Sequence, residues 1–234
     1  MRLGLLVCDS VAEELRPVHG DYPEMFNSLF AAAPEVDLVT YDVRVGTYPS
    51  RLDDCDAYIT TGSRLSAYDD EPWITELERF IRQLDEARHP LVGICFGHQL
   101  MAQALGGIVR QSDKGWGMGV RRAVVVGREG WMQPRLDELA LHMSHRDQVE
   151  ELPERARLLA TSAHCAVAAF AVGDHFLAIQ GHPEFDQDYM AALIRRRADI
   201  VGSDAARAAL ATIGEETHEQ VVIAWVLNFV SARS

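Results

Sequence analysis

The chain has 234 residues, of which 48% are hydrophobic and 24% charged, and these proportions suit one soluble globular domain with a full core. Its formal charge of −13 argues against nucleic acid as the main partner, because phosphate binding needs basic patches. The longest apolar stretch, Val221 to Val230, has about half the length that a bilayer span requires, so no membrane segment is expected. The four cysteines are widely spaced and form no CxxC pair, which favours a reducing cytoplasm over a disulfide framework or a zinc site.

The N-terminal half alternates short apolar runs with amphipathic stretches. The runs predict strands at 3–7, 36–41, 57–60 and 91–94, and a helix is expected at 23–33. A second helix should begin at Pro72, a favoured first helical residue, and stop before His89-Pro90. Its apolar side chains fall on one face: Trp73, Leu77, Phe80, Ile81 and Leu84. This alternation predicts a mostly parallel sheet with helices on both faces.

The pattern changes from Gly119 onward. Successive strands are predicted at 120–126, 139–143, 158–162, 167–172 and 176–180, with few helices between them, and indicate an antiparallel extension of the sheet. The chain then returns to helix at 187–201, 205–213 and 217–232. We therefore expect a three-layer α/β fold in a single domain, 1–234, in which residues 186–234 form a helical C-terminal extension.

The most informative segment is Gly93-Ile94-Cys95-Phe96-Gly97, which lies where an apolar strand meets a helical segment. A GxCxG sequence at such a junction has the form of a nucleophile elbow, in which the glycines permit a sharp turn that exposes the cysteine. The helix dipole favours the thiolate, and the first free N–H groups of the helix can bind an oxyanion. The alternative is an inert buried cysteine beside a helix start.

A base for this cysteine is predicted at Gly181-His182-Pro183-Glu184, which follows an apolar strand. His182 would lie at a strand end, where catalytic groups of α/β sheets gather, and Glu184 can reach back to orient the imidazole. An isolated HPE is more often a turn with a solvated histidine. Its occurrence together with the cysteine elbow favours the catalytic interpretation.

Three motifs in order resemble the class I (triad-type) glutamine amidotransferases. They are GICFGHQ with the following Leu100 to Gly107, the later GHPE, and the segment Ala57 to Ser63, which looks like that family's oxyanion loop. Met143 to Val149 resembles a segment in the amidotransferase domain of GMP synthetase, the member closest in motif. The matches run from about Leu3 to Glu184.

The resemblance implies a role for several residues. Cys95 would be the nucleophile, His182 the general base and Glu184 its orienter. Backbone N–H groups at Phe96 and near Gly62 would form the oxyanion hole, and the implied substrate-binding positions are Gln99, Arg146 and Asp147. Arg146 stands where relatives usually have glycine, and Ser63-Arg64 replaces a more usual Pro-Gly. Both departures leave room for a substrate larger than glutamine.

Three functions follow as hypotheses. The first is a glutaminase that forms a cysteine thioester and passes ammonia to a synthetase partner, since the chain has no Walker-type phosphate loop of its own. The second is a stand-alone γ-glutamyl peptide or conjugate hydrolase with the same triad. The third is an inactive binding module on this fold. No cofactor or metal is expected for any of them, and glutamine or a γ-glutamyl small molecule is the expected ligand.

Other segments carry weaker signals. The stretch Val221 to Leu227 is apolar all round a helix, which predicts burial in its own domain or, second, a homodimer interface. Trp116, in a glycine-rich loop, is expected at the rim of the substrate pocket. Arg195 to Arg197 is interpreted as a solvated helix face, and His98 as part of the elbow's lining rather than a second base.

Overall fold

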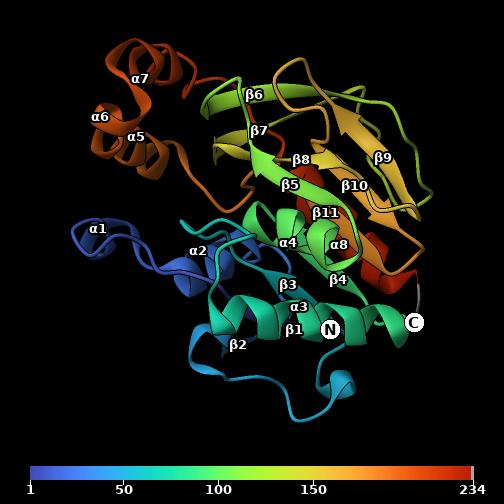
Figure 1. The fold of residues 1–234 in the computed structure, drawn as a ribbon. Coiled ribbons are helices and arrows are strands. Elements are labelled where there is room, and N and C mark those ends of the chain that lie inside the picture. Colours follow the sequence, from blue (N-terminus) through green and yellow to red (C-terminus); the bar gives the residue numbers. More distant parts are fainter. Residues whose placement is uncertain (233–234) are drawn as a thin grey trace.

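The computed structural model describes residues 1–232 and is built around a nine-stranded sheet with the order β2-β1-β3-β4-β11-β10-β9-β6-β7 (Figure 1). The pairings from β2 to β11 are parallel, and those from β11 to β7 are antiparallel. The expected α/β class with an antiparallel extension is confirmed. In sheet order the strands are β2 (Asp37–Asp42), β1 (Arg2–Val7), β3 (Ala57–Thr60), β4 (Leu91–Ile94), β11 (Phe176–Ile179), β10 (Ala169–Val172), β9 (Ala156–Thr161), β6 (Gly117–Val125) and β7 (Glu138–His145).

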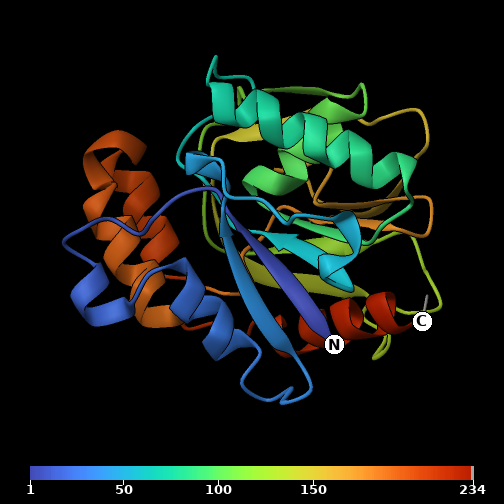
Figure 2. The same cartoon turned by 90° about the horizontal axis from the view of Figure 1, so that it is seen from below.

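Helices cover both faces of the sheet, which passes between them in the view from below (Figure 2). Side chains of α3 and α4 join one buried cluster, and side chains of α2 and α8 join the other. Helices α5 to α7 lie together at one end of the molecule, beside α1 (Figures 1 and 2). The helices are α1 (Arg16–His19), α2 (Tyr22–Leu29), α3 (Pro72–Glu86), α4 (Phe96–Ala104), α5 (Gln187–Arg196), α6 (Ala198–Val201), α7 (Ser203–Leu210) and α8 (Glu219–Ser231), with 3₁₀ turns at Val43–Val45 and Leu52–Asp54.

The central strands contribute side chains to both cores because successive residues of a strand point to opposite faces. In β1, Leu3 and Leu5 enter the cluster with α2 and α8, whereas Leu6 enters the cluster with α3 and α4. Residues Leu3, Leu5 and Leu6 are all completely buried. Such two-sided burial is why these strands appear in the sequence as unbroken apolar runs.

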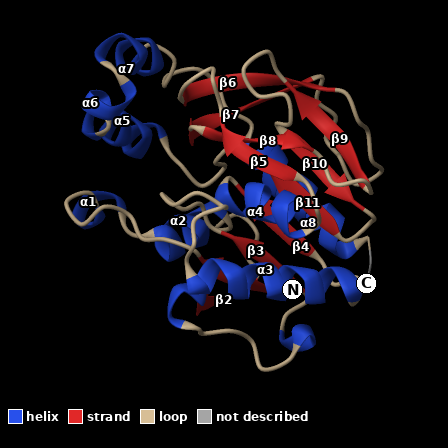
Figure 3. Cartoon of the chain, in the orientation of Figure 1, coloured by secondary structure: helices blue, strands red, loops and turns tan. Residues whose placement is uncertain are grey.

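Several elements differ from the expectation, among them α1, which was not predicted, and the predicted helix 187–201, which is interrupted at Arg197 between α5 and α6. Helix α2 starts at a capping box made by Asp21 and Glu24 but ends at Leu29, earlier than predicted, and Pro34 follows the turn that closes it. A separate two-stranded antiparallel sheet, β5 (Ile108–Gln111) with β8 (Asp147–Glu151), was not predicted (Figure 3). Its strands are short and partly exposed, so they lack a clear apolar pattern.

Helix α8 packs against the chain's own core. Trp225 is buried and donates a hydrogen bond from Nε1 to the carbonyl of Pro134, at 2.8 Å, while the ring of Trp131 meets Phe229 edge-on. This packing accounts for the apolar sequence of the helix, and a homodimer through it stays a prediction. Within residues 1–232, every helix is too short or too polar to traverse a lipid bilayer.

Candidate active site

Cys95 lies in a strained turn between β4 and α4. Its φ and ψ are 50° and −98°, a conformation that few residues other than glycine adopt. The turn is tight because glycines stand on both sides. A Cβ at Gly93 would lie 2.7 Å from the carbonyl oxygen of Gly97, and a Cβ at Gly97 would overlap the hydroxyl group of Thr60. The predicted elbow is therefore present, and it places Cys95 at the N-terminus of α4.

His182 and Glu184 follow β11, the strand that pairs with β4 in parallel. The N–H of His182 donates to the carbonyl of His142 at 2.8 Å, which fixes the main chain beyond the strand end. The side-chain Nδ1 donates to Oε1 of Glu184 at 2.8 Å, and the imidazole stacks on Phe185 with 3.9 Å between ring centroids. The imidazole is thus held at its Nδ1 edge by Glu184 and on one face by Phe185.

Cys95 and His182 are hydrogen-bonded neighbours, although the chain separates them widely. Burial alone lowers the pKa of His182, but the charges and hydrogen bonds of Cys95 and Glu184 outweigh it and raise that pKa from 6.5 to about 10. The imidazole therefore favours its protonated form beside the sulfur. Gln180 also donates from Nε2 to Sγ of Cys95, at 3.5 Å.

The backbone at Gly62 and Phe96 adjoins the sulfur. A Cβ at Gly62 would lie 2.9 Å from Cε1 of His182 and 3.7 Å from Cβ of Cys95, so only glycine permits this close approach. Phe96 is the first residue of α4, and its N–H has no acceptor within the helix. The arrangement provides backbone near the thiol for a developing oxyanion.

The implied substrate-binding residues line a cavity of about 70 Å³ above Cys95. Gln99 is buried and donates from Nε2 to the carbonyl of Asp147 at 2.8 Å and to Oε1 of Gln180 at 3.1 Å. Asp147 accepts from Ser66 Oγ at 2.5 Å, and its other oxygen has no partner among residues 1–232. The cavity is lined by Ser63, Arg64, Leu65, Ser66, Cys95, Gln99, Trp116, Ser144, His145, Arg146, Asp147 and Arg197.

The interpretation of Arg195 to Arg197 as a solvated face is wrong for Arg197. Arg197 directly follows α5, and its N–H still donates to the carbonyl of Leu193 as in a helix. It stands four residues after Leu193, on the buried face, where it lines the cavity and Nη1 donates to Ser144 Oγ at 2.6 Å. Arg195 and Arg196 remain exposed. Trp116 lines the cavity as expected.

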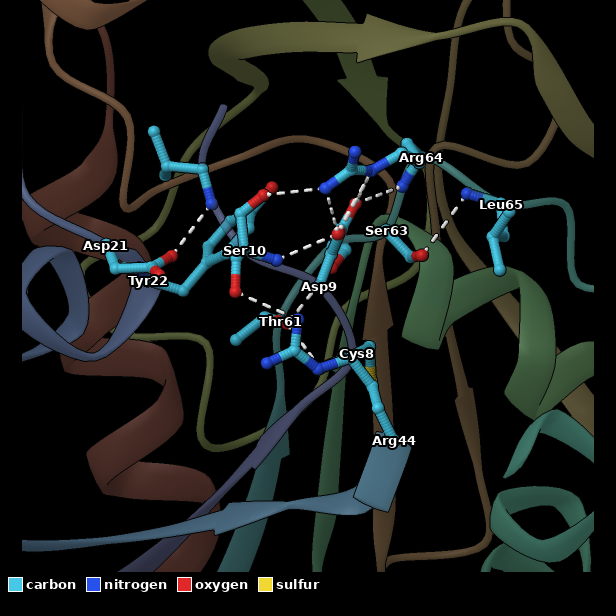
Figure 4. A network of polar contacts seen from close by, with 12 residues as sticks. Cys8, Asp9, Ser10, Asp21, Tyr22, Arg44, Thr61, Ser63, Arg64 and Leu65 are labelled. Carbon is cyan, nitrogen blue, oxygen red and sulfur yellow. Dashed lines mark hydrogen bonds and ion pairs between the residues drawn. The ribbon is translucent and has the colours of Figure 1, made fainter. Parts of the chain in front are cut away.

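Arg64 lines the cavity and forms an ion pair with Asp9, a partner that the sequence did not predict. Figure 4 shows its guanidinium against the carboxylate of Asp9, with Nη2 at 2.7 Å from Oδ1 and the backbone N–H at 2.8 Å from Oδ2. These bonds raise the pKa of Arg64 further. Asp9 comes two residues after β1, at the end of the strands where the other site residues gather, and that position was the available signal.

His98 does not contact this cavity. It is completely buried, and its ring packs against Phe170 with 5.0 Å between centroids. Burial lowers its pKa to about 3, so it stays neutral and contributes to the lining of the elbow.

Comparison with known proteins now places the chain in a family. A family model described as glutamine amidotransferase class-I matches residues 33–198. The chain belongs to this family. The chain is 35% identical over 203 residues to gamma-glutamyl peptidase 3 of Arabidopsis thaliana, and the match covers 83% of this chain and 80% of that protein. It is 36% identical over 156 residues to the GMP synthase of Bordetella parapertussis, covering 62% of this chain but 28% of that longer protein.

The class-I amidotransferase fold is shared by solved structures. A glutamine amidotransferase from Thermotoga maritima matches with a TM-score of 0.77 at 22% identity, covering 100% of this chain and 97% of that one. This likeness extends beyond residue 198, where the family model ends, over α7 and α8.

Proposed function

We propose that the chain is a γ-glutamyl peptide or conjugate hydrolase that uses Cys95 as its nucleophile. The observation that carries this proposal is the row Cys95–His182–Glu184, whose Cys95 lines a cavity with charged residues at its rim. Similarity to gamma-glutamyl peptidase 3 over 83% of the chain supports the peptide substrate over glutamine. The comparisons thus favour the second of the three hypotheses from the sequence.

The geometry supports a two-step reaction. The thiolate of Cys95 attacks the γ-carbonyl carbon, and the oxyanion forms next to the backbone at Phe96 and Gly62. The C–N bond breaks as the imidazolium of His182 gives its proton to the leaving amine, and a γ-glutamyl thioester remains on Cys95. His182 then takes a proton from water, the hydroxide attacks the thioester carbon, and the C–S bond breaks to release glutamate. Glu184 holds the imidazole in place throughout.

Trapping the thioester tests this proposal. The purified chain is mixed with γ-glutamylglycine, quenched in acid and digested, and mass spectrometry is used to seek a γ-glutamyl group on the Cys95 peptide. Released glycine and glutamate are measured in parallel. The variant Cys95→Ala should show neither adduct nor release. Cys55→Ala is the matched control, because Cys55 is also buried but lies in the cluster with α3 and α4 under Tyr41. Full hydrolysis by Cys95→Ala contradicts the proposal.

A glutaminase that feeds a synthetase subunit is the second candidate, and the 36% identity to GMP synthase over 156 residues favours it. Glutamine in place of γ-glutamylglycine distinguishes the two. A glutaminase should release ammonia from glutamine at least as efficiently as glycine from the dipeptide. The four cysteines are free, which supports a reducing cytoplasm as the site of either activity.

A further inference from the structure

Two arginines meet one aromatic ring at the rim of the cavity. The guanidinium carbon of Arg197 lies 5.5 Å from the centroid of the Trp116 ring, and that of Arg146 lies 5.8 Å from it. All three side chains are half-buried, whereas Cys95 below them is buried. Cation–π contact holds the guanidinium groups near the ring but leaves their N–H groups able to donate.

Neither of these two arginines meets a carboxylate partner in the part of the chain that the structure describes. No ion pair of Arg146 or Arg197 occurs within residues 1–232, and Nε of Arg146 is buried without a hydrogen-bond partner there. Arg64 differs, because Asp9 neutralises it. Among the described residues that line the cavity, Asp147 is the one carboxylate, so at the rim the two arginines outnumber it by one. A half-buried positive charge without a partner favours an anionic ligand.

The excess charge discriminates between substrates. Free glutamine carries an α-ammonium and an α-carboxylate, whose charges cancel. The ammonia that leaves from glutamine has no carboxylate for the arginines to bind. A γ-glutamyl dipeptide has the same glutamyl end and a further carboxylate on the amino acid that leaves. Its net charge of about −1 at neutral pH complements the cavity, since carboxyl groups ionise near pH 3.5.

We propose that Trp116, Arg146 and Arg197 form a subsite for the carboxylate of the leaving amino acid. The substrates are then γ-glutamyl peptides with a free C-terminal carboxylate, preferred over glutamine and over neutral γ-glutamyl amides. This inference rests on the hydrolase function proposed above. It adds the residues that select the leaving group.

The subsite is held by three separate elements. Arg197 caps the end of α5, and its backbone N–H donates to the carbonyl of Leu193 at 3.0 Å, while its side chain is anchored on Ser144. Trp116 precedes β6, where Gly117 fits closely because a Cβ there would lie 2.7 Å from Nε2 of His145. The ring and the Arg197 guanidinium are thus positioned before a ligand arrives, and Arg146 lies against the same ring.

Selectivity kinetics test the subsite. Values of kcat and KM are measured for γ-glutamylglycine and for γ-glutamylglycinamide, which differ only in the carboxylate. The wild-type chain should prefer the acid in kcat/KM by roughly 10- to 100-fold, as expected for a charge-assisted hydrogen bond, and mainly through KM. Arg197→Met should reduce this ratio to near one, and Arg197→Lys should restore part of it. Arg195→Met is the matched control, because Arg195 is exposed on the preceding turn and should keep the wild-type ratio.

Two outcomes overturn the subsite. One is a wild-type chain that does not distinguish acid from amide. The other is an equal loss on both substrates in Arg197→Met, which would place Arg197 at the glutamyl end or in the support of the fold.

Calorimetric binding to Cys95→Ala separates this inference from the hydrolase function. If the wild type hydrolyses neither compound but the variant binds the acid about tenfold more tightly than the amide, the subsite stands and the hydrolase proposal falls. Equal binding of the two compounds overturns the subsite, whatever the turnover.

Discussion

The floor and the rim of the cavity are built differently. The floor is the triad, which reaches the cavity through Cys95: Cys95 and His182 follow two central parallel strands, and Glu184 comes two residues further on. The rim consists of Arg64, Trp116, Arg146 and Arg197, which lie between regular elements. Floor residues are buried and fixed by neighbouring backbone, whereas rim residues are half-buried or exposed. The proposed chemistry thus lies at the ends of rigid strands, and the proposed selection of substrate lies on connecting segments.

The largest effect is expected from the floor. Replacing His182 with Ala removes both the acceptor of the thiol proton and the donor to the leaving amine. We expect kcat/KM for γ-glutamylglycine to fall by about 10²- to 10⁴-fold, the usual contribution of a general acid–base group. His19→Ala serves as the control, because the ring of His19 packs edge-on against Tyr189 rather than beside Cys95. A loss of less than about tenfold would remove His182 from the mechanism.

Glu184→Gln should alter the pH profile and cost less activity than His182→Ala. Because Glu184 helps to raise the pKa of His182, the variant should lower that pKa, and the alkaline fall of kcat/KM should begin at a lower pH than the wild-type value of about 10. A histidine whose pKa is raised by folding stabilises the fold fully below its ordinary 6.5 and loses this contribution as pH rises through about 10. Rates and thermal unfolding between neutral and strongly alkaline pH check both statements. An unchanged alkaline limb would contradict them.

A floor defect can also be introduced without touching a titratable group. Gly97→Ala places a methyl group against Thr60, whose hydroxyl accepts from the N–H of Ile94 at 3.0 Å. We expect the free energy of unfolding to fall by about 1 to 3 kcal/mol, the usual cost of overpacking. Urea denaturation measures it, with Gly130→Ala as the control, because a Cβ at Gly130 meets nothing within 4 Å. Equal stability of the two variants would show that the elbow adapts.

The smallest effect is expected at the rim. Arg64→Met breaks the ion pair with Asp9, but the Arg64 side chain is 59% exposed and Asp9 keeps its backbone donors at Ser10 and residue 64. The free energy of unfolding should therefore fall by less than about 1 kcal/mol. Denaturation of this variant beside the wild type checks it. A loss above about 2 kcal/mol would mean that the pair supports the fold rather than the rim.

The same division explains what the sequence could predict. The floor was accessible because apolar runs mark the buried strands, and GxCxG and HPE stand where those runs end. Their proximity follows from the parallel pairing of β4 with β11. The catalytic roles themselves stay predictions. Strands β5 and β8 were missed because each is short and partly exposed.

Arg197 was missed for a different reason. Its neighbours in sequence are charged and exposed, and that charge pattern assigns all three arginines to one solvated face. The signal that locates Arg197 is its spacing of three and four residues from the buried Ile194 and Leu193, which puts it on the inner face. Asp9 pairs with Arg64 across the ends of two parallel strands, a contact that depends on the tertiary register.

Strand β7 connects the two regions mechanically. Its His142 carbonyl holds the main chain of His182, its Ser144 anchors Arg197, and Arg146 follows where the strand ends. A displacement of this single strand along its axis would move His182 together with Arg146 and Arg197. Substitutions that weaken the pairing of β7 with β6 should therefore change both the turnover rate and the affinity for the substrate carboxylate. A change in this strand that affects one of the two properties should affect the other as well.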